Sequence, residues 1–543
     1  MSDKVASYLQ QHLVGEVTHA KEVRDFFSTD GSVFSVMPRL VVYPKNTTDV
    51  RKVARFAWQL AERKTPVTIT PRGLGSDQGG AAIGPGISMV FPAHMNRVLQ
   101  LDKDSVTVQP GENYQSLQKM LHTHHRFLPP YPSSIAFSTI GGAVANNAAG
   151  EKTLKYGATR EYVKKLQVVL ANGELIETGR LSKRDVNRKM GETTFEAEIY
   201  RQLDALLEEN SEIIKKSKLN VSKNSAGYNL IDVRRKDGSI DLTPLIVGSQ
   251  GTLGIVTQIQ LKTEAYSPQT SLIAAHFDSL DDANIAVQSL VSLNPSALEI
   301  VDSHLLKLVQ EDNPNRLKGI VDEPYPAIIL LIEFDDTKDL VRKRKTKKAV
   351  KIVGNTAREY KIATEVHERE LLWKIRHSAA AVMWHTKGTA KALPIIEDGI
   401  VPNDKFVAYI KHIYAMYQKF GLDAAIWGHA GNSNLHMQPF LDLSKTGDRQ
   451  KVFQIMDEYY NEVIKMGGST AGEHSDGRLR APYLPKLLGE EMYGVLRKVK
   501  HIFDPYDVLN AGVKIDVERD DLIKALRHEY SMSHLGHHLP RTH

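Results

Sequence analysis

Two histidines in the last quarter of the chain have the types and spacing of metal ligands. His429 and His436 bracket the polar stretch WGHAGNSNLH, and the later run TAGEH adds Glu473 and His474. Two imidazoles and one carboxylate suit a zinc-like divalent ion that keeps a coordination position open. Single histidines are more often structural residues, but the downstream Glu-His pair favours a metal centre. The rest of the chain must define the reaction that such a centre serves.

Composition bounds the class of protein. The 543 residues exceed one ordinary core, so two or three domains are expected. No apolar run approaches the roughly 18 residues of a membrane span, and the first residues lack a secretory signal pattern. The absence of cysteine excludes disulfides and iron–sulfur clusters from this chain. These features predict a cytoplasmic protein, with a peripheral position at the inner face of the membrane left open.

Charge gives little indication of a macromolecular partner. The net charge is +6, and the densest basic run lies at residues 342–348. Such a run can bind nucleic acid, but a solvated helix face is the favoured interpretation, so no nucleic-acid partner is expected. Residues 527–543 carry five histidines and few apolar residues, and we expect a frayed terminus there.

The elements before the metal motif begin as an α/β pattern. Residues 40–44 read as a short strand, and a helix capped by Thr47 or Thr48 follows. Residues 67–70 read as a second strand that leads into the glycine-rich loop at residues 71–80. Consecutive backbone N–H groups in such a loop suit a pyrophosphate, although a simple tight turn is the alternative.

Two further stretches of small residues, at 138–150 and 247–256, favour a pyrophosphate-binding loop over a simple tight turn. Nothing in them is bulky, so the backbone can approach a flat ligand closely; the alternative is close packing of a helix on a sheet. Three separated loops of one character indicate one extended ligand. After residue 266 the expected strands at 272–277, 298–301 and 328–334 and the helix at 281–293 form an α+β pattern.

These stretches together resemble the FAD-binding domain of the vanillyl-alcohol-oxidase-type flavoproteins, which have the PCMH fold. The motifs that carry the resemblance are RGLGS, STIGGAVANNAAG, NSAGY, GSQGTLGIVT and a closing FDP…LNAG. The resemblance spans residues 37–515, and the similar branch contains D-lactate dehydrogenases, the glycolate oxidase flavin subunit and D-2-hydroxyglutarate dehydrogenases.

The resemblance implies an α+β fold, with a two-part FAD-binding domain, a ferredoxin-like substrate domain and a C-terminal helical segment that returns to the flavin. The expected organisation is a helical lead-in (1–36), the FAD-binding domain (37–265), the substrate and metal domain (266–480), the returning segment (481–516) and a His-rich tail (517–543).

The family pattern also implies which residues contact FAD. The expected cofactor-binding residues are Pro71, Arg72, Gly73, Leu74, Gly75, Ser76, Pro132, Ser138, Thr139, Gly141, Gly142, Ala145, Asn146, Gly150, Tyr156, Gly157, Gly251, Gly254, Ile255, Val256 and Asn510. Members with covalent flavin have a histidine where Leu74 stands, so the resemblance implies noncovalent FAD.

For the chemistry, the resemblance implies His429, His436 and Glu473 as ligands of a divalent metal, Zn or Mn, and His474 as the base. Arg376 and Lys391 are expected to bind a substrate carboxylate, since arginine pairs with carboxylates through two parallel hydrogen bonds. A structural ion pair is the alternative for Arg376. The chain departs from the family pattern at Asn432, Ser433 and Gln438, and we expect these positions to bear on substrate identity.

The implied activity is oxidation of a small 2-hydroxy acid to the 2-oxo acid, with hydride passing to the flavin. Reduced flavin then needs an external electron acceptor, which is a quinone, an iron–sulfur or electron-transfer flavoprotein partner, or oxygen. A non-redox enzyme similar to alkylglycerone-phosphate synthases and a regulatory protein with a vestigial flavin domain are the alternatives. A homodimer is left open.

Overall fold

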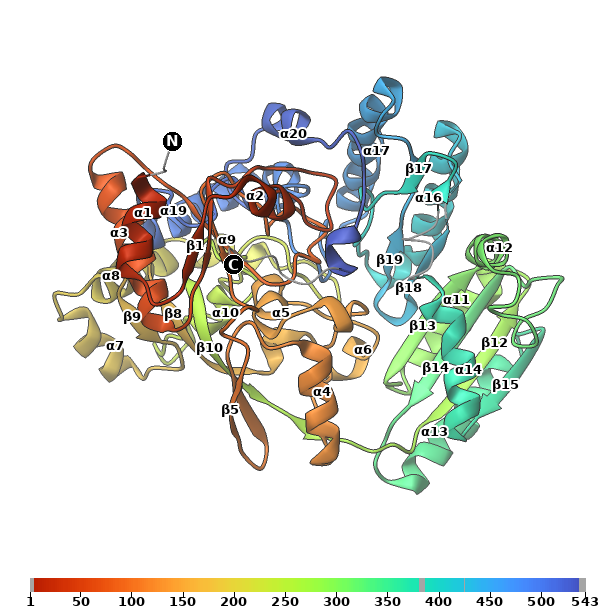
Figure 1. Cartoon of the computed structure of the whole chain (residues 1–543). Helices are drawn as coiled ribbons and strands as arrows, with labels where there is room; N and C mark the ends of the chain where they lie inside the picture. The colour runs from red at the N-terminus through yellow and green to blue at the C-terminus, as the bar shows by residue number, and fades with distance from the viewer. Residues whose placement is uncertain (1–3, 380–385, 424, 537–543) are drawn as a thin grey trace.

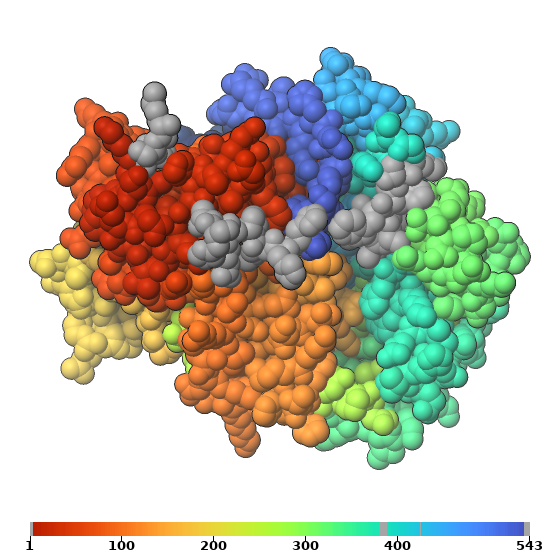
Figure 2. Space-filling model, viewed as in Figure 1, coloured from red at the N-terminus to blue at the C-terminus, as the bar shows by residue number. Residues whose placement is uncertain are grey.

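The computed structural model describes residues 4–379, 386–423 and 425–536. The chain forms two lobes: residues up to about 265 (red to yellow-green in Figure 1) form one, and the segment from β12 to β20 (green to blue-green) forms most of the other. The segment after residue 440 (blue) lies between and above them, as the space-filling view also shows (Figure 2). The described part of the chain has no helix that is both long and apolar enough to cross a bilayer.

A four-stranded sheet of order β1-β2-β4-β3 opens the first lobe. Its strands are β1 (Glu16–Thr18), β2 (Leu40–Tyr43), β3 (Ile69–Arg72) and β4 (Ile87–Val90). Every residue of β2 and β4 is buried, as expected for parallel strands covered on both faces. The expectation of a purely helical lead-in is wrong, because β1 pairs antiparallel with β2 between α1 (Lys4–His12) and α2 (Lys21–Phe27).

The helix α3 (Thr47–Glu62) packs on this sheet through Val50, Val53, Ala54 and Ala57. Its cap is not Thr47 or Thr48: the side chain of Asn46 accepts the hydrogen bond from the Asp49 N–H (3.0 Å). Asn46 lies just outside the helix with the extended backbone that capping requires, so its amide oxygen reaches that N–H.

A second, antiparallel sheet of order β5-β6-β10-β8-β9 completes the first lobe. Its strands are β5 (Val98–Leu101), β6 (Ser105–Val108), β8 (Val163–Val169), β9 (Leu175–Glu177) and β10 (Ile255–Lys262), with the short pair β7 (Arg126–Phe127) and β11 (Glu264–Ala265) beside it. β8 and β9 form a hairpin across Asn172-Gly173. The helices of this region are α4 (Tyr114–Thr123), α5 (Ile140–Asn146), α6 (Thr153–Tyr156), α7 (Lys183–Met190), α8 (Phe195–Glu209), α9 (Ser211–Lys216) and α10 (Thr243–Ile246).

The second lobe is built on a six-stranded antiparallel sheet of order β15-β12-β14-β13-β18-β19. The strands are β12 (Ser271–Phe277), β13 (Ala297–Asp302), β14 (Ile328–Phe334), β15 (Glu359–Ala363), β18 (Ile426–His429) and β19 (Asn434–Met437), and a small sheet adds β16 (Thr386–Lys387), β17 (Ala390–Ala392) and β20 (Phe440–Leu441). The helices are α11 (Leu280–Val291), α12 (Ser303–Asp312), α13 (Asp339–Val353), α14 (Val366–His377), α16 (Phe406–Phe420) and α17 (Thr446–Lys465). The basic run lies on α13 with most of its charges facing solvent, so the solvated-face interpretation is confirmed.

The C-terminal segment returns to the first lobe. After α18 (Leu484–Leu488), helix α19 (Glu490–Phe503) inserts Met492, Leu496 and Phe503 into the core beneath the second sheet. The expectation of a frayed terminus over residues 527–543 is wrong for residues 527–536. Helix α20 (Arg519–Ala525) is followed by an extended stretch and the short turn η6 (Ser533–Gly536). Tyr530 and Met532 of the extended stretch and His534 of η6 are buried.

Candidate flavin and metal site

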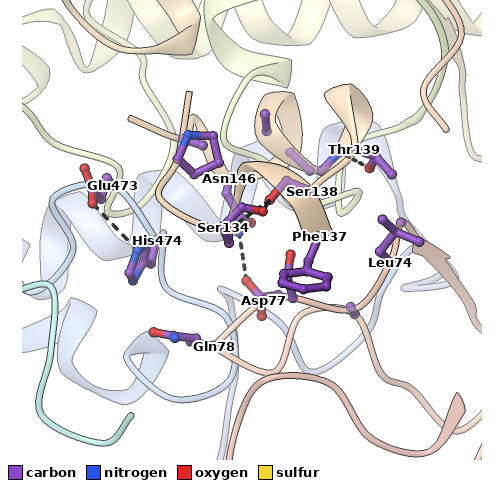
Figure 3. A pocket seen from close by; sticks show the side chains of 18 of the residues that line it. Leu74, Asp77, Gln78, Ser134, Phe137, Ser138, Thr139, Asn146, Glu473 and His474 are labelled. Carbon is purple, nitrogen blue, oxygen red and sulfur yellow. Dashed lines mark hydrogen bonds and ion pairs between the residues drawn. The ribbon is translucent and has the colours of Figure 1, made fainter. Parts of the chain in front are cut away.

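The glycine-rich loops of the first lobe and the metal motif of the second face one cavity of ≈ 590 Å³. In Figure 3 the side chains of Glu473 and His474 lie on one side of this pocket and those of Leu74, Phe137 and Thr139 on the other. The expected cofactor residues that line it are Pro71, Arg72, Gly73, Leu74, Gly75, Ser76, Pro132, Ser138, Thr139, Gly141, Gly142, Ala145, Asn146, Gly251, Gly254 and Val256. Three segments far apart in the sequence therefore do converge on one space.

Five expected cofactor residues are not in the lining, although they lie close behind it. Tyr156 donates to Asp335 (3.0 Å), which directly follows β14, and Ile255 is buried in the core beneath the first sheet. Asn510 ties two loops together, since its amide donates to the carbonyls of Ala81 (2.9 Å) and Gln250 (2.7 Å). The other two are Gly150 and Gly157.

The first loop offers a row of free backbone donors. Within the described residues, the N–H groups of Gly73 to Asp77 donate no hydrogen bond, while the side chain of Asp77 accepts from the N–H groups of Gly79 (3.0 Å) and Ala81 (2.8 Å). Partly buried N–H groups are costly when they lack an acceptor, so this arrangement fits a pyrophosphate. A Cβ on Gly73 would lie 2.5 Å from Thr139 Oγ1, which shows why the loop needs glycine there.

A chain of side-chain hydrogen bonds joins the three loops. Asn146 donates to Asp77 (2.8 Å), Gln250 donates to Asn146 (2.9 Å), and Gln250 accepts from the N–H of Gly477 (2.8 Å). The amide of Gln250 lets one side chain both donate and accept here. The pocket wall is thus held together by a polar network in which the amides of Asn146 and Gln250 link the Asp77 carboxylate to the backbone of Gly477.

The metal motif is a β-hairpin that aims two imidazoles the same way. His436 is directly opposite Trp427 in the pairing of β18 with β19, and His429 is two residues from Trp427, so both histidines project from one face. Their Nε2 atoms are 3.4 Å apart. Glu473 Oε1 lies 3.2 Å from each of these nitrogens.

The three residues can hold a divalent ion. All three are buried, and their donor atoms converge without an intervening side chain, as the metal sites of two histidines and one carboxylate require. A second convergent group, Glu397, His436 and His474, shares His436 with the first. Glu397 is also paired with the guanidinium of Arg480, so its oxygens are already engaged.

Two of the three proposed ligands, His429 and Glu473, are oriented by buried partners. Glu299 Oε1 lies 2.7 Å from His429 Nδ1, so the other ring nitrogen, Nε2, is the one that can bind a metal ion. The second oxygen of Glu473 pairs with the ammonium of Lys223, which is also buried. Burial opposes charge on Glu473, but Lys223 and His429 outweigh it and hold the pKa of Glu473 well below its usual range. Carboxylate–histidine pairs of this kind fix the tautomer of metal ligands.

His474 is positioned by two acidic residues of one loop. Glu397 Oε1 lies 2.8 Å from His474 Nδ1, and the Asp398 carboxylate accepts the backbone N–H groups of Glu473 (3.0 Å) and His474 (2.8 Å). Burial lowers the pKa of His474, but Glu397 and Asp398 outweigh it and raise this pKa to about 9. The remaining nitrogen, Nε2, lies 3.7 Å from Glu473 Oε1.

Arg376 lines the cavity and is paired with a buried acid. Its Nε donates to Glu299 (2.8 Å), the carboxylate that also contacts His429. The structural ion pair considered above therefore exists, but it uses only Nε: within the described residues both terminal nitrogens of Arg376 make no hydrogen bond. Lys391 lies on β17 and is not among the lining residues.

The three departures from the family pattern have different positions. Gln438 is buried and lines the cavity. Asn432 instead donates to Ser222 (2.9 Å), and Ser433 donates to Asn403 (2.8 Å). Neither lines the cavity, so among the three departures only Gln438 is placed where it can contact a ligand in this cavity.

Sequence reasoning missed the buried partners Lys223, Glu299, Glu397, Asp398 and Arg480. Two signals were available: Lys223 directly precedes the NSAGY element, and Glu397-Asp398 is an acidic pair in an apolar stretch. Their roles depend on contacts with residues far along the chain, as between Lys223 and Glu473.

Comparisons with known proteins agree with this arrangement. Residues 38–179 match the FAD binding domain, and residues 267–513 match the C-terminal domain of FAD linked oxidases. The chain is 30% identical over 485 residues to the glycolate oxidase subunit GlcD of Bacillus subtilis, covering 88% of this chain and 89% of that protein.

It is also 29% identical over 517 residues to the D-2-hydroxyglutarate dehydrogenase of Escherichia coli, covering 93% of this chain but only 50% of that protein. The chain thus spans about half the length of that relative. The fold matches p-cresol methylhydroxylase with a TM-score of 0.68 at 12% identity, over 95% of this chain and 97% of that one. The chain therefore belongs to the FAD-linked oxidase family, within the PCMH-type flavoproteins.

Proposed function

We propose that the protein is a FAD-dependent dehydrogenase that oxidises a small 2-hydroxy acid of the D-lactate, glycolate or D-2-hydroxyglutarate type to the 2-oxo acid. The observation that carries this proposal is the shared cavity: loops with free backbone donors and the cluster of His436, Glu473, His474 and Arg376 line the same space. The relatives named for glycolate and D-2-hydroxyglutarate support the substrate class.

Removal of a hydride from C2 requires that the hydroxyl proton also leaves. Bound FAD supplies the two-electron acceptor, and a divalent ion, Zn or Mn, held by His429, His436 and Glu473 supplies a Lewis acid. His474 takes the hydroxyl proton at Nε2, while Glu397 holds its Nδ1. With a divalent ion held beside Glu473, charge repulsion would favour the neutral form of the His474 imidazole, which is the form that a base needs.

The substrate carboxylate is assigned to Arg376. Its two terminal nitrogens form the planar fork that binds a carboxylate through parallel hydrogen bonds, and the Glu299 contact fixes the plane of the guanidinium. Lys391 is kept as a second anion-binding candidate from the family pattern. Gln438 lines the same cavity, so it is the departure that bears on which 2-hydroxy acid is accepted.

Electrons leave through an external acceptor: a quinone, an iron–sulfur or electron-transfer flavoprotein partner, or oxygen. The test of the function needs none of them. Purified protein is mixed without oxygen with D-lactate, glycolate, D-2-hydroxyglutarate and the L-isomers, and loss of visible flavin absorbance is recorded. Bleaching by one 2-hydroxy acid is expected. Bleaching by another class of alcohol but by none of these acids contradicts the proposal.

A further inference from the structure

The chain beyond the matched family domains, which end at residue 513, continues back across the first lobe. Leu526 forms a β-bridge with Phe34, and the Arg527 N–H donates to the Val33 carbonyl (2.9 Å). The Tyr530 hydroxyl donates to the carbonyl of Gly31 (2.9 Å) and is buried. Residues 526–530 are therefore fastened to the loop at residues 29–35.

This attachment brings two side chains to the cavity and a third against the backbone of the first glycine-rich loop. Met532 and Leu535 line it, together with the glycine-rich loops. Between them, His534 is only 7% exposed, and its Nε2 lies 2.9 Å from the carbonyl oxygen of Gly75. Because a carbonyl oxygen can only accept, Nε2 is the protonated nitrogen in this contact.

The His534 contact acts on the peptide group that follows Gly75. In a trans peptide the C=O and the next N–H point in opposite directions, so holding the Gly75 oxygen also fixes the direction of the Ser76 N–H. That N–H is one of the free donors of the first loop. The left-handed conformation of Gly75 (φ 79°) is thereby held by a side chain from the other end of the chain.

We infer that residues 526–536 are a wall of the FAD site, which retains the noncovalent dinucleotide by covering the first glycine-rich loop. The inference rests on the FAD binding in the proposed function. Met532 belongs to the same apolar cluster as Phe34 of the first lobe and Leu435 of the second. Release of FAD then requires this segment to separate from both lobes.

Retention of FAD is the measurement that tests this wall. Holoenzyme is diluted, and the gain in flavin fluorescence gives the rate of FAD release. The double substitution Met532→Ala with Leu535→Ala is expected to speed release by about tenfold or more, because it removes apolar surface from the wall. Ser533→Ala is the matched control: Ser533 is exposed between the two lining residues, so its release rate should not change.

A second pair of variants tests whether the hydrogen bond from His534 to Gly75 contributes to FAD retention, apart from any general weakening of the attachment of residues 526–536. His534→Gln keeps an N–H donor and should release FAD at nearly the original rate, whereas His534→Phe should release it several-fold faster. Circular dichroism of the apoproteins shows whether each variant is folded.

Unchanged release from folded double and Phe variants, or wild-type protein that binds no FAD, overturns the inference. Faster release from protein whose flavin is bleached by no 2-hydroxy acid upholds the wall and contradicts only the proposed reaction.

Discussion

His429 Nε2 and His436 Nε2 face each other at 3.4 Å, with Glu473 Oε1 at 3.2 Å from both. Two imidazoles and one carboxylate whose donor atoms converge on one small space are an arrangement typical of a metal site. If a divalent ion belongs there, His436→Ala should lower metal affinity by more than the roughly 10–100-fold that loss of an outer-shell partner costs. Metal content after gel filtration measures this.

His304→Ala provides the control for that experiment, since the side chain of His304 is 54% exposed and far from the cluster in sequence. It should keep its metal. FAD content should stay the same in both variants because neither residue lines the glycine-rich part of the cavity. Equal metal content in the two variants would contradict the assignment of His436 as a ligand.

The buried Lys223–Glu473 pair should matter most when the metal is absent. Removing one partner of a buried pair leaves an uncompensated charge, which costs about 3–5 kcal/mol. A divalent ion on Glu473 supplies the missing positive charge. We therefore expect Lys223→Met to lower the free energy of unfolding strongly in a chelator and much less in excess Zn²⁺.

Denaturant unfolding in the two conditions checks this, with Lys419→Met as the control. Lys419 pairs with Glu458 on the surface, where such a pair contributes at most about 1 kcal/mol. A loss for Lys223→Met that is the same with and without metal would assign Lys223 to packing alone.

Arg376→Lys should separate charge from geometry in substrate binding. Lysine keeps the positive charge but loses both the fork and the Nε contact with Glu299. Charged hydrogen bonds contribute about 1.5–3 kcal/mol each, so the KM for the 2-hydroxy acid should rise roughly 10–100-fold. Steady-state kinetics with an artificial electron acceptor measures the effect. An unchanged KM would mean that Arg376 does not bind the substrate carboxylate and serves only in the ion pair with Glu299.

Gly73→Ala should weaken FAD binding because its Cβ would lie 2.5 Å from Thr139 Oγ1. Overpacking of this kind costs about 1–3 kcal/mol, or roughly 5- to 150-fold in the Kd for FAD. Titration of apoprotein with FAD measures it. Gly447→Ala is the matched control, since no atom lies within 4 Å of the added Cβ and the position is in the first turn of α17. If the Kd for FAD is the same in Gly73→Ala and in the control, the clash with Thr139 does not limit FAD binding and the prediction is wrong.

FAD retention should fall as the pH is lowered through the range in which His534 titrates. Burial, and then the nearby Arg72 and Arg527, lower the pKa of His534 from 6.5 to about 4, while the backbone contact with Gly75 opposes them. A histidine whose pKa is lowered in the docked state binds its proton better when the segment is detached. The free energy with which His534 helps to hold residues 526–536 on the first glycine-rich loop is therefore fully present above pH 6.5. It is lost as the pH falls toward 4.

At pH 5 this difference amounts to on the order of 2 kcal/mol, so FAD release should be roughly 10- to 30-fold faster than at pH 7.5. His534→Gln retains the donor but does not titrate, so its release rate should vary much less over the same range. A steep pH dependence that is identical in both proteins would assign the effect to other groups.

Much of the first lobe could be predicted because its signals are local. The glycine-rich loops are short-range features, and a backbone that must approach a ligand admits only small residues, as Gly73 beside Thr139 illustrates. The hairpin at Asn172-Gly173 is set by its own two turn residues. The metal motif could also be predicted, since His429 and His436 are close in sequence and joined by a turn.

The partners of that motif could not be predicted in the same way. Lys223 contacts Glu473 only because the two lobes meet, and no local pattern links the two positions. The buried tail did leave a signal that was not used: Tyr530, Met532 and His534 alternate with exposed residues, which is the pattern of an extended segment with one buried face. The many histidines there favour a solvent-exposed segment. The burial of His534 against Gly75 could not be predicted, because these two residues come together only in the folded chain.

The cavity wall formed by Met532 and Leu535 has a consequence for the order in which the protein matures. The first glycine-rich loop is synthesised long before the segment that covers it, and the whole second lobe is made between them. During translation the nucleotide pocket therefore stays open on that side until residues 526–536 have been synthesised. Loading of FAD can precede closure, and closure by residues 526–536 is then a late step that commits the cofactor.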